Sequence, residues 1–157
     1  MKAKSYTLLY IIGSVWTLLL AVSCNDNRVY DHYEHTQLKG WERNDTLTFN
    51  IPPVSKGTYQ LNIGIRANQD YPFKTISIVM SRKTMPKGII KNDTIRCKII
   101  EDNGKLAGQN GISSTELRYH VRDLELNQGD SLHITLNHCM RREILPGLSE
   151  IGLQLVK

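Results

Sequence analysis

Apolar residues alternate with polar ones through most of the chain beyond residue 46. Successive side chains of a strand point to opposite faces of a sheet, so this spacing gives each segment one apolar and one polar face. The spacing predicts seven half-buried strands. Their inward-facing residues are expected to be Leu47, Phe49 and Ile51; Tyr59, Leu61, Ile63 and Ile65; Ile76, Ile78 and Met80; Ile95, Cys97 and Ile99; Leu117, Tyr119 and Val121; Leu132, Ile134 and Leu136; and Ile151, Leu153 and Leu155.

Turn-forming residues separate these segments. Pro52-Pro53, Asn103-Gly104 and Pro146-Gly147 are three such signals, and residues of these types favour turns over regular structure. Helices are disfavoured because β-branched residues crowd the preceding helical turn but fit a pleated sheet. A chain of 157 residues suits one domain. We therefore expect an all-β fold, a single antiparallel β-sandwich of about seven to eight strands over residues 46–157.

The amino-terminal residues have the layout of a lipoprotein export signal. Two lysines precede an uncharged run from Ser5 to Cys24, which closes with Ala21-Val22-Ser23-Cys24. The small residues admit a peptidase, and the thiol can take a diacylglycerol thioether. We therefore predict a lipoprotein signal peptide over residues 1–23 and lipidation of Cys24, with membrane lipid as a partner. An uncleaved membrane anchor is the alternative, since a run of this length could span a bilayer.

Residues 24–45 are polar and are expected to form a lipid-anchored tether. Asp, Asn, His, Glu and Gln surround Val29-Tyr30 and Trp41, which leaves little apolar surface for a core. As a flexible coil, about twenty residues span on the order of 25 Å. The sandwich is therefore expected to lie near the anchoring membrane.

Charge and motif content exclude several function classes. Loss of residues 1–23 removes two lysines and lowers the formal net charge from +5 to +3, too little for a highly basic nucleic-acid domain. Beyond them the chain has no Gly-x-Ser-x-Gly, His-Glu-x-x-His or Cys-x-x-Cys motif. His32 and His35 lie in a segment not predicted to be helical, so they do not converge on a metal. We therefore expect no enzyme, no metal or other cofactor, no small-molecule substrate and no nucleic-acid partner.

Two cysteines lie within the expected sandwich. Cys97 alternates with Ile95 and Ile99 and should face the core, whereas Cys139 falls out of phase with Ile134 and Leu136. A buried, free Cys97 is therefore the preferred interpretation. A Cys97–Cys139 disulfide, which export to an oxidising compartment would permit, remains the alternative.

Three segments place Asp, a hydroxyl residue and an aliphatic residue in succession. They are Asp45-Thr46-Leu47, Asp93-Thr94-Ile95 and Asp130-Ser131-Leu132. The pattern resembles the O-glycosylation motif of exported Bacteroidota proteins, which makes Thr46, Thr94 and Ser131 candidate modification sites. A turn that ends in Asp before a strand that begins with Thr or Ser would give the same pattern without a sugar. Both interpretations stay open.

Three longer segments carry a family resemblance. They are residues 23–31, residues 62–73 with the element Arg66-x-Asn68-x-Asp70-Tyr71-x-Phe73, and His138-x-Met140-Arg141 followed by residues 148–153. Over nearly all of the chain beyond the signal peptide, they resemble the GldH family of gliding-motility lipoproteins.

This resemblance implies a function and a location. It implies a non-catalytic, lipid-anchored component of the gliding-motility machinery, associated with type IX secretion, or its homologue in a non-gliding bacterium. The implied place is the cell envelope, facing the periplasm, with inner and outer membrane both open, and the implied partners are other envelope lipoproteins.

Four residues of these segments are candidate partner-binding residues: Arg66, Asp70, Tyr71 and Arg141. Asn68, Asp70 and Pro72 favour a tight turn, so a purely structural corner, with Arg66 bonded to turn carbonyls, is the competing interpretation. A carbohydrate-binding β-sandwich lipoprotein, in which Trp41 or Tyr71 stacks on sugar, is the alternative function class.

Overall fold

The alternation in the sequence becomes alternating burial along strands. The computed structural model describes residues 27–157, and the predictions for the signal peptide and Cys24 lie outside this range. Three of its eleven strands have only two residues. The strands are β1 (Arg28–His35), β2 (Trp41–Glu42), β3 (Leu47–Ile51), β4 (Gly57–Ala67), β5 (Thr75–Met85), β6 (Ile89–Lys98), β7 (Gln109–Asn110), β8 (Thr115–Leu126), β9 (Ser131–His138), β10 (Ile144–Leu145) and β11 (Leu148–Val156).

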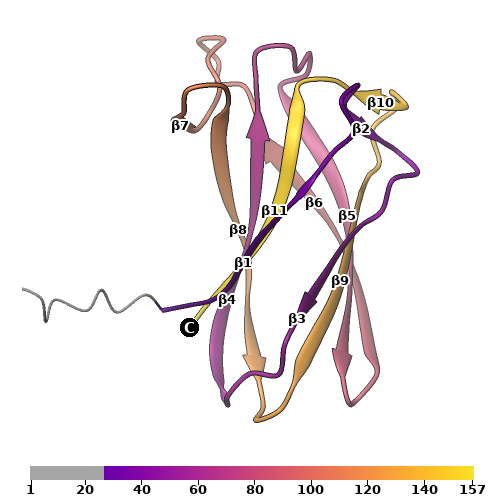
Figure 1. Ribbon diagram of the computed structural model, residues 1–157, viewed down its shortest axis with the longest axis vertical. Coiled ribbons are helices and arrows are strands. Elements are labelled where there is room, and N and C mark those ends of the chain that lie inside the picture. The colour runs from indigo at the N-terminus through magenta and orange to yellow at the C-terminus, as the bar shows by residue number, and fades with distance from the viewer. Residues whose placement is uncertain (1–26) are drawn as a thin grey trace, which may run out of the picture.

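Two antiparallel sheets pack face to face, as Figure 1 shows. One has the order β1-β11-β4-β8-β7 and the other the order β3-β9-β5-β6, while β10 and β2 form a small separate ladder. The inner faces carry a continuous apolar core that includes Phe49, Ile63, Ile78 and Leu153. The predicted all-β sandwich is therefore confirmed. Between residues 27 and 157 the chain has no helix of the length and apolarity that crossing a membrane requires.

All seven predicted strands form, but the alternation in β8 changes phase. Val121 is an extra residue in the ladder with β4, because Asn62 lies opposite His120 while Leu61 lies opposite Arg122. Such a bulge moves every later side chain to the other face. Arg122, Leu124 and Leu126 therefore point to the inner face, and Val121 is only half-buried.

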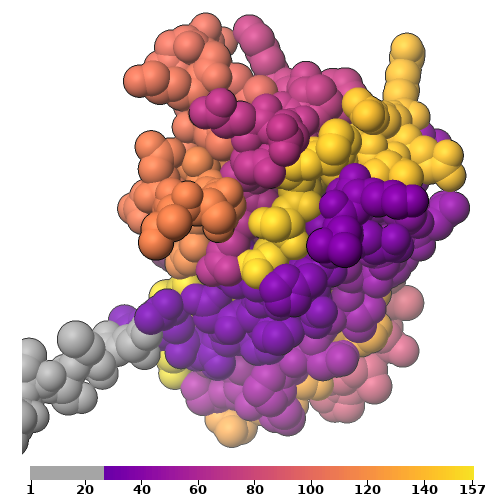
Figure 2. All heavy atoms as spheres, turned by 45° about the horizontal axis from the view of Figure 1, so that its top comes forward, coloured from indigo at the N-terminus to yellow at the C-terminus, as the bar shows by residue number. Residues whose placement is uncertain are grey.

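The expected tether is wrong from Arg28 onward. Residues 28–35 form β1, an edge strand that pairs with β11, and Figure 2 shows this segment lying across the molecule beside the carboxyl-terminal strand. Trp41 is fully buried, and its indole N–H donates to the Asp45 carbonyl at 3.0 Å. Backbone pairing with β11 and the packing of Tyr30 and Tyr33 hold β1 in place, and its other residues are polar, which explains why its sequence resembles a linker.

The cysteines follow the preferred interpretation. Cys97 is buried and Cys139 is exposed, and both are free thiols. Burial raises the pKa of the Cys97 thiol to about 12, so it stays protonated at neutral pH.

Candidate functional site

The outer face of the five-stranded sheet, the face turned away from the core, carries an ion cluster built by strand register. Arg66 of β4 alternates with buried Ile65 and Ala67 and therefore points outward. It lies directly opposite Glu150 of β11 and Glu116 of β8. Its guanidinium donates to Glu150 and lies 3.5 Å from a Glu116 carboxylate oxygen. Opposite charges on facing positions stabilise a sheet.

Tyr33 of β1 completes this arrangement by lying across two glycines. A Cβ on Gly64 would come 2.1 Å from the Tyr33 hydroxyl oxygen, and one on Gly152 would come 2.7 Å from its ring. The missing side chains let the ring lie under Arg66, whose Cζ is 4.3 Å from the ring centroid, a cation–π geometry. The Tyr33 hydroxyl donates to Glu116 at 3.0 Å.

Arg118 of β8 adds a second cation, 2.6 Å from Glu116. The five residues Tyr33, Arg66, Glu116, Arg118 and Glu150 are called the outer-face cluster below. Its residues come from four strands, and its charges, which lie on β4, β8 and β11, are held at fixed spacing. The side chains of Arg66, Glu116 and Arg118 are about a third exposed or slightly more, so a partner can reach them.

The cluster also fixes its own protonation states. Burial acts to raise the pKa of Glu116, but hydrogen bonds from Arg118 and Tyr33 and the charges of both arginines hold that pKa below its ordinary value. Burial, followed by the hydrogen bond to Glu116, raises the pKa of Tyr33 to about 12. Glu116 is therefore an anion and Tyr33 a neutral donor at physiological pH.

Two shallow hollows flank the cluster on the β7–β8 side. Their volumes are about 500 and 440 Å³. Both carboxylates of the cluster are engaged by arginines, which suits recognition of a polar surface better than acid–base chemistry. The polar residues around the hollows include Gln109, Asn110, Ser114 and Ser149.

The structure separates the four candidate partner-binding residues. Tyr71 is buried, and its hydroxyl donates to the Thr75 carbonyl at 3.1 Å, while Asp70 lies exposed in the turn after β4. Arg141 is exposed, and its carbonyl accepts a hydrogen bond from Arg43. Tyr71 is thus a corner residue, whereas Arg66 bonds carboxylates across the sheet instead of turn carbonyls. A partner-binding role for all four residues stays a prediction.

Two aromatic residues named for the carbohydrate-binding alternative, Trp41 and Tyr71, are buried, and the alternative itself stays a prediction. Trp41 and Tyr71 are at most 2% exposed, so neither can stack on a sugar. Trp41 packs edge-on against His138, with ring centroids 5.4 Å apart.

The candidate glycosylation sites differ in their surroundings. Thr46 and Thr94 are exposed, and Ser131 is half-buried at the start of β9. Asp130 accepts from the Asn127 backbone N–H at 2.9 Å and closes a turn, as expected for an unmodified motif. Asp93, in contrast, lies within β6 and pairs with Arg122 at 2.6 Å, so the turn explanation fails there. Modification of these residues stays a prediction.

Sequence reasoning missed Tyr33, Glu116 and Glu150. Each lies more than 30 residues from Arg66 along the chain, and only the strand register brings them together. Among residues 27–157, no group of three or more His, Cys, Asp or Glu residues is arranged to hold a metal ion.

Fold and site together define a small antiparallel β-sandwich with an ion cluster on the outer face of one sheet. The chain belongs to the GldH lipoprotein family, whose model matches residues 28–155. It is 26% identical over 146 residues to the gliding motility lipoprotein GldH of Flavobacterium johnsoniae, covering 87% of this chain and 89% of the relative. It is 24% identical over 152 residues to a GldH homologue of Christiangramia forsetii, covering 91% and 92%. The family resemblance is therefore confirmed.

A solved structure shares the fold alone. A family GH115 4-O-methyl-α-glucuronidase with specificity for decorated arabinogalactans aligns with a TM-score of 0.53 at 10% identity. The alignment covers 85% of this chain but only 18% of the enzyme.

Proposed function

We propose that this lipoprotein is anchored through acylated Cys24 and faces the periplasm as a non-catalytic component of the gliding-motility machinery associated with type IX secretion, or of its counterpart in a non-gliding bacterium. Family membership supports the motility assignment. Its task in this proposal is to hold other envelope lipoproteins at the membrane.

The observation that carries the proposal is the outer-face cluster. Four strands fix its charges in place before any partner arrives, so binding costs little side-chain ordering. Alternating signs across Arg118, Glu116, Arg66 and Glu150 select a partner with the complementary order of charges.

Affinity purification of the lipidated full chain from its own envelope in mild detergent tests this function. Wild-type protein is expected to recover at least one envelope lipoprotein reproducibly. Arg118→Glu, which reverses an exposed charge of the cluster, is expected to lower that recovery about tenfold.

The matched control is Arg96→Glu. Arg96 is an exposed cation on β6 of the other sheet, so its reversal changes net charge equally without touching the cluster. Thermal unfolding of both variants checks that each is folded. Recovery of no reproducible partner by wild-type protein, or an equal loss with both reversals, would contradict the proposal.

A further inference from the structure

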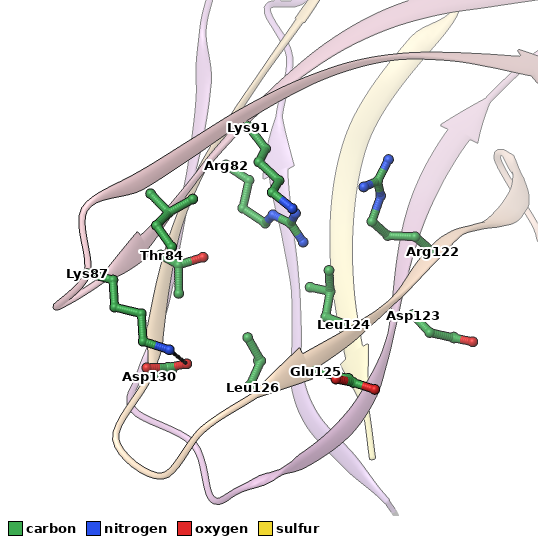
Figure 3. A pocket seen from close by; sticks show the side chains of 11 residues that line it. Arg82, Thr84, Lys87, Lys91, Arg122, Asp123, Leu124, Glu125, Leu126 and Asp130 are labelled. Atoms are coloured by element: carbon green, nitrogen blue, oxygen red, sulfur yellow. Dashed lines mark ion pairs between the residues drawn. The ribbon is translucent and has the colours of Figure 1, made fainter.

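A pocket opens between the two sheets, whereas the outer-face cluster lies on the outer face of the five-stranded sheet. Its volume is about 290 Å³. It lies where β6 ends the four-stranded sheet and the second half of β8 faces it from the five-stranded sheet. Figure 3 shows the side chains that line it, with Lys87 paired to Asp130 at one end.

Besides Lys87, three cations converge on this pocket from the two sheets. Arg82 of β5 lies directly opposite Lys91 of β6, a like-charge pair that destabilises a sheet when nothing neutralises it. Arg122 reaches the same space from β8 because the bulge at Val121 turns it inward. Figure 3 shows Arg82 and Lys91 side by side.

The carboxylates that face inward do not balance these charges. Asp93 binds Arg122 at 2.6 Å, and Asp130 lies 3.8 Å from Lys87. Asp123 and Glu125 also line the pocket, but they alternate with the inward residues of β8 and their side chains are exposed to solvent. The inward set of Arg82, Lys91 and Arg122 against Asp93 is left with a surplus of positive charge.

Arg82 is the least satisfied group in the pocket. It is only 6% exposed, and its Nε–H has no hydrogen-bond partner within residues 27–157. The Nε of Arg122 and one carboxylate oxygen of Asp93 are also buried without a partner among these residues. Burial, then the charge of Arg122, lowers the pKa of Arg82, whereas Asp93 acts in the opposite direction. A guanidinium nevertheless keeps its charge in proteins, so burying it unpaired is costly.

A bound oxyanion would neutralise the repulsion among the cations and would also accept hydrogen bonds from the buried Nε–H groups. A neutral acceptor could bond the Nε–H groups but would leave the repulsion among the cations unchanged. Carboxylate and phosphate oxygens match the donor geometry of a guanidinium and neutralise its charge. Leu124 and Leu126 line the pocket beside the cations and suit a ligand with a small apolar part.

We propose that this pocket binds the oxyanion group, carboxylate or phosphate, of a small ligand through Arg82, Lys91 and Arg122. This site is separate from the outer-face cluster, and its existence does not depend on the proposed function.

Titration of the full chain at constant ionic strength tests the pocket, with succinate in one arm and inorganic phosphate in the other. The readout is the NMR signal of the Nε–H groups of Arg82 and Arg122. At least one probe is expected to shift both signals saturably, and the probe with the lower dissociation constant identifies the preferred oxyanion. Arg82→Gln and Lys91→Gln are each expected to raise that constant about tenfold or more.

Lys83→Gln is the matched control, because Lys83 neighbours Arg82 on β5 and points to the opposite face. Its dissociation constant is expected to equal that of wild-type protein. Lys91 is exposed, so its variant keeps the test valid if Arg82→Gln does not fold. Absence of a saturable shift in both arms, or an equal weakening by Lys83→Gln, would overturn the site.

Discussion

At the scale of single residues, Gly64 decides whether Tyr33 can lie flat on the sheet. The Tyr33 hydroxyl is 2.1 Å from where a Cβ on Gly64 would be. Gly64→Ala is therefore expected to displace the ring, break its hydrogen bond to Glu116 and its contact with Arg66, and lower the free energy of unfolding by about 1–3 kcal/mol. Urea unfolding measures this loss.

Two controls isolate the clash. Gly57→Ala, on the same strand, would meet the flexible far end of the Lys157 side chain at 3.0 Å and the Tyr59 ring at an ordinary contact distance of 3.6 Å, and is expected to change stability by less than about 0.5 kcal/mol. In a Tyr33→Ala background, Gly64→Ala should cost nothing further, because the ring that it strikes is gone. A full cost in that background would refute the steric explanation.

The contribution of Glu116 to the stability of the fold is expected to depend on pH in the acidic range. Its folded-state pKa lies below the ordinary value, so its contribution to stability is complete above that value and is lost as the pH falls through the folded-state pKa. Glu116→Gln is expected to make the free energy of unfolding less dependent on pH between about pH 5 and pH 3. Unfolding titrations at several pH values measure the slope, with Glu125→Gln, an exposed carboxylate on the same strand, as control. Equal slopes in wild-type protein and Glu116→Gln would be evidence against this assignment.

At the scale of strands, His138 at the end of β9 contacts Trp41 of β2 through a hydrogen bond and a ring contact. Its Nε2 lies 3.1 Å from the Trp41 carbonyl, and the two rings pack edge-on. Burial lowers the pKa of His138, as does the charge of Arg43, although bonds to the Trp41 and Glu143 backbones act against this. The folded protein therefore holds this histidine neutral where the unfolded chain would bind a proton.

The expected consequence is a loss of stability below pH 6.5. The unfolded chain takes up a proton that the folded state excludes, so the free energy of unfolding should fall between pH 7 and pH 5. His138→Gln should reduce this fall, whereas His133→Gln, an exposed histidine on the same strand, should leave it unchanged. The measurement is chemical unfolding across this range, and an unaltered fall in His138→Gln would show that other groups cause it.

Strand patterning explains how much of the fold the sequence could predict. Strands with one apolar face, such as β4 and β9, carry their burial pattern in their own residues, so alternation located them. Backbone pairing holds β1, and hydrophobic alternation does not record such pairing, so the sequence of β1 resembles a tether. The bulge at Val121 is likewise not predicted by the hydrophobic pattern. One extra residue interrupts the alternation briefly, and the end of a strand interrupts it in the same way.

The candidate site was predictable only in part, for the same reason. Arg66 was selected from its motif, but its partners depend on register between strands distant in sequence. Tyr71 and Trp41 are buried, but the sequence does not predict this, because aromatic residues outside predicted strands give no sign of burial. The pocket around Arg82 needs both the hairpin register and the β8 bulge, so the sequence carried no signal for it.

At the scale of the whole molecule, the extent of β1 shortens the distance between the sandwich and the proposed anchor at Cys24. Three residues separate Cys24 from Arg28, where β1 begins. At about 3.3–3.6 Å per residue, the connection from Cys24 to Arg28 spans at most roughly 14 Å, instead of the roughly 25 Å expected for a longer tether. The Asn27 carbonyl accepts from the backbone N–H of Lys157 at 2.9 Å, so the chain reaches the sandwich at the end where its carboxyl terminus lies (Figure 1).

This geometry sets an upper limit to the distance between the outer-face cluster and the membrane. Tyr33 lies five residues beyond Arg28 along β1, which adds roughly 17 Å at the rise of an antiparallel strand. With Cys24 acylated, the cluster should lie within about 30 Å of the lipid. A partner anchored in the same membrane then meets it at a raised effective concentration, so modest contacts suffice.

Changing the anchor should therefore weaken partner binding without altering the sandwich. A Cys24→Ala chain carrying a cleavable signal is expected to lose partner recovery by about 10²-fold. A lipidated chain with twenty Gly and Ser residues inserted between Asn27 and Arg28 should fall between that form and wild-type protein, because a longer linker dilutes the tethered domain. Both forms should unfold at the wild-type temperature, since neither change touches residues of the two sheets. Rescue of a deletion phenotype, scored beside partner recovery, completes the comparison: full rescue by the untethered form would show that the place of the domain at the membrane is not what its function requires.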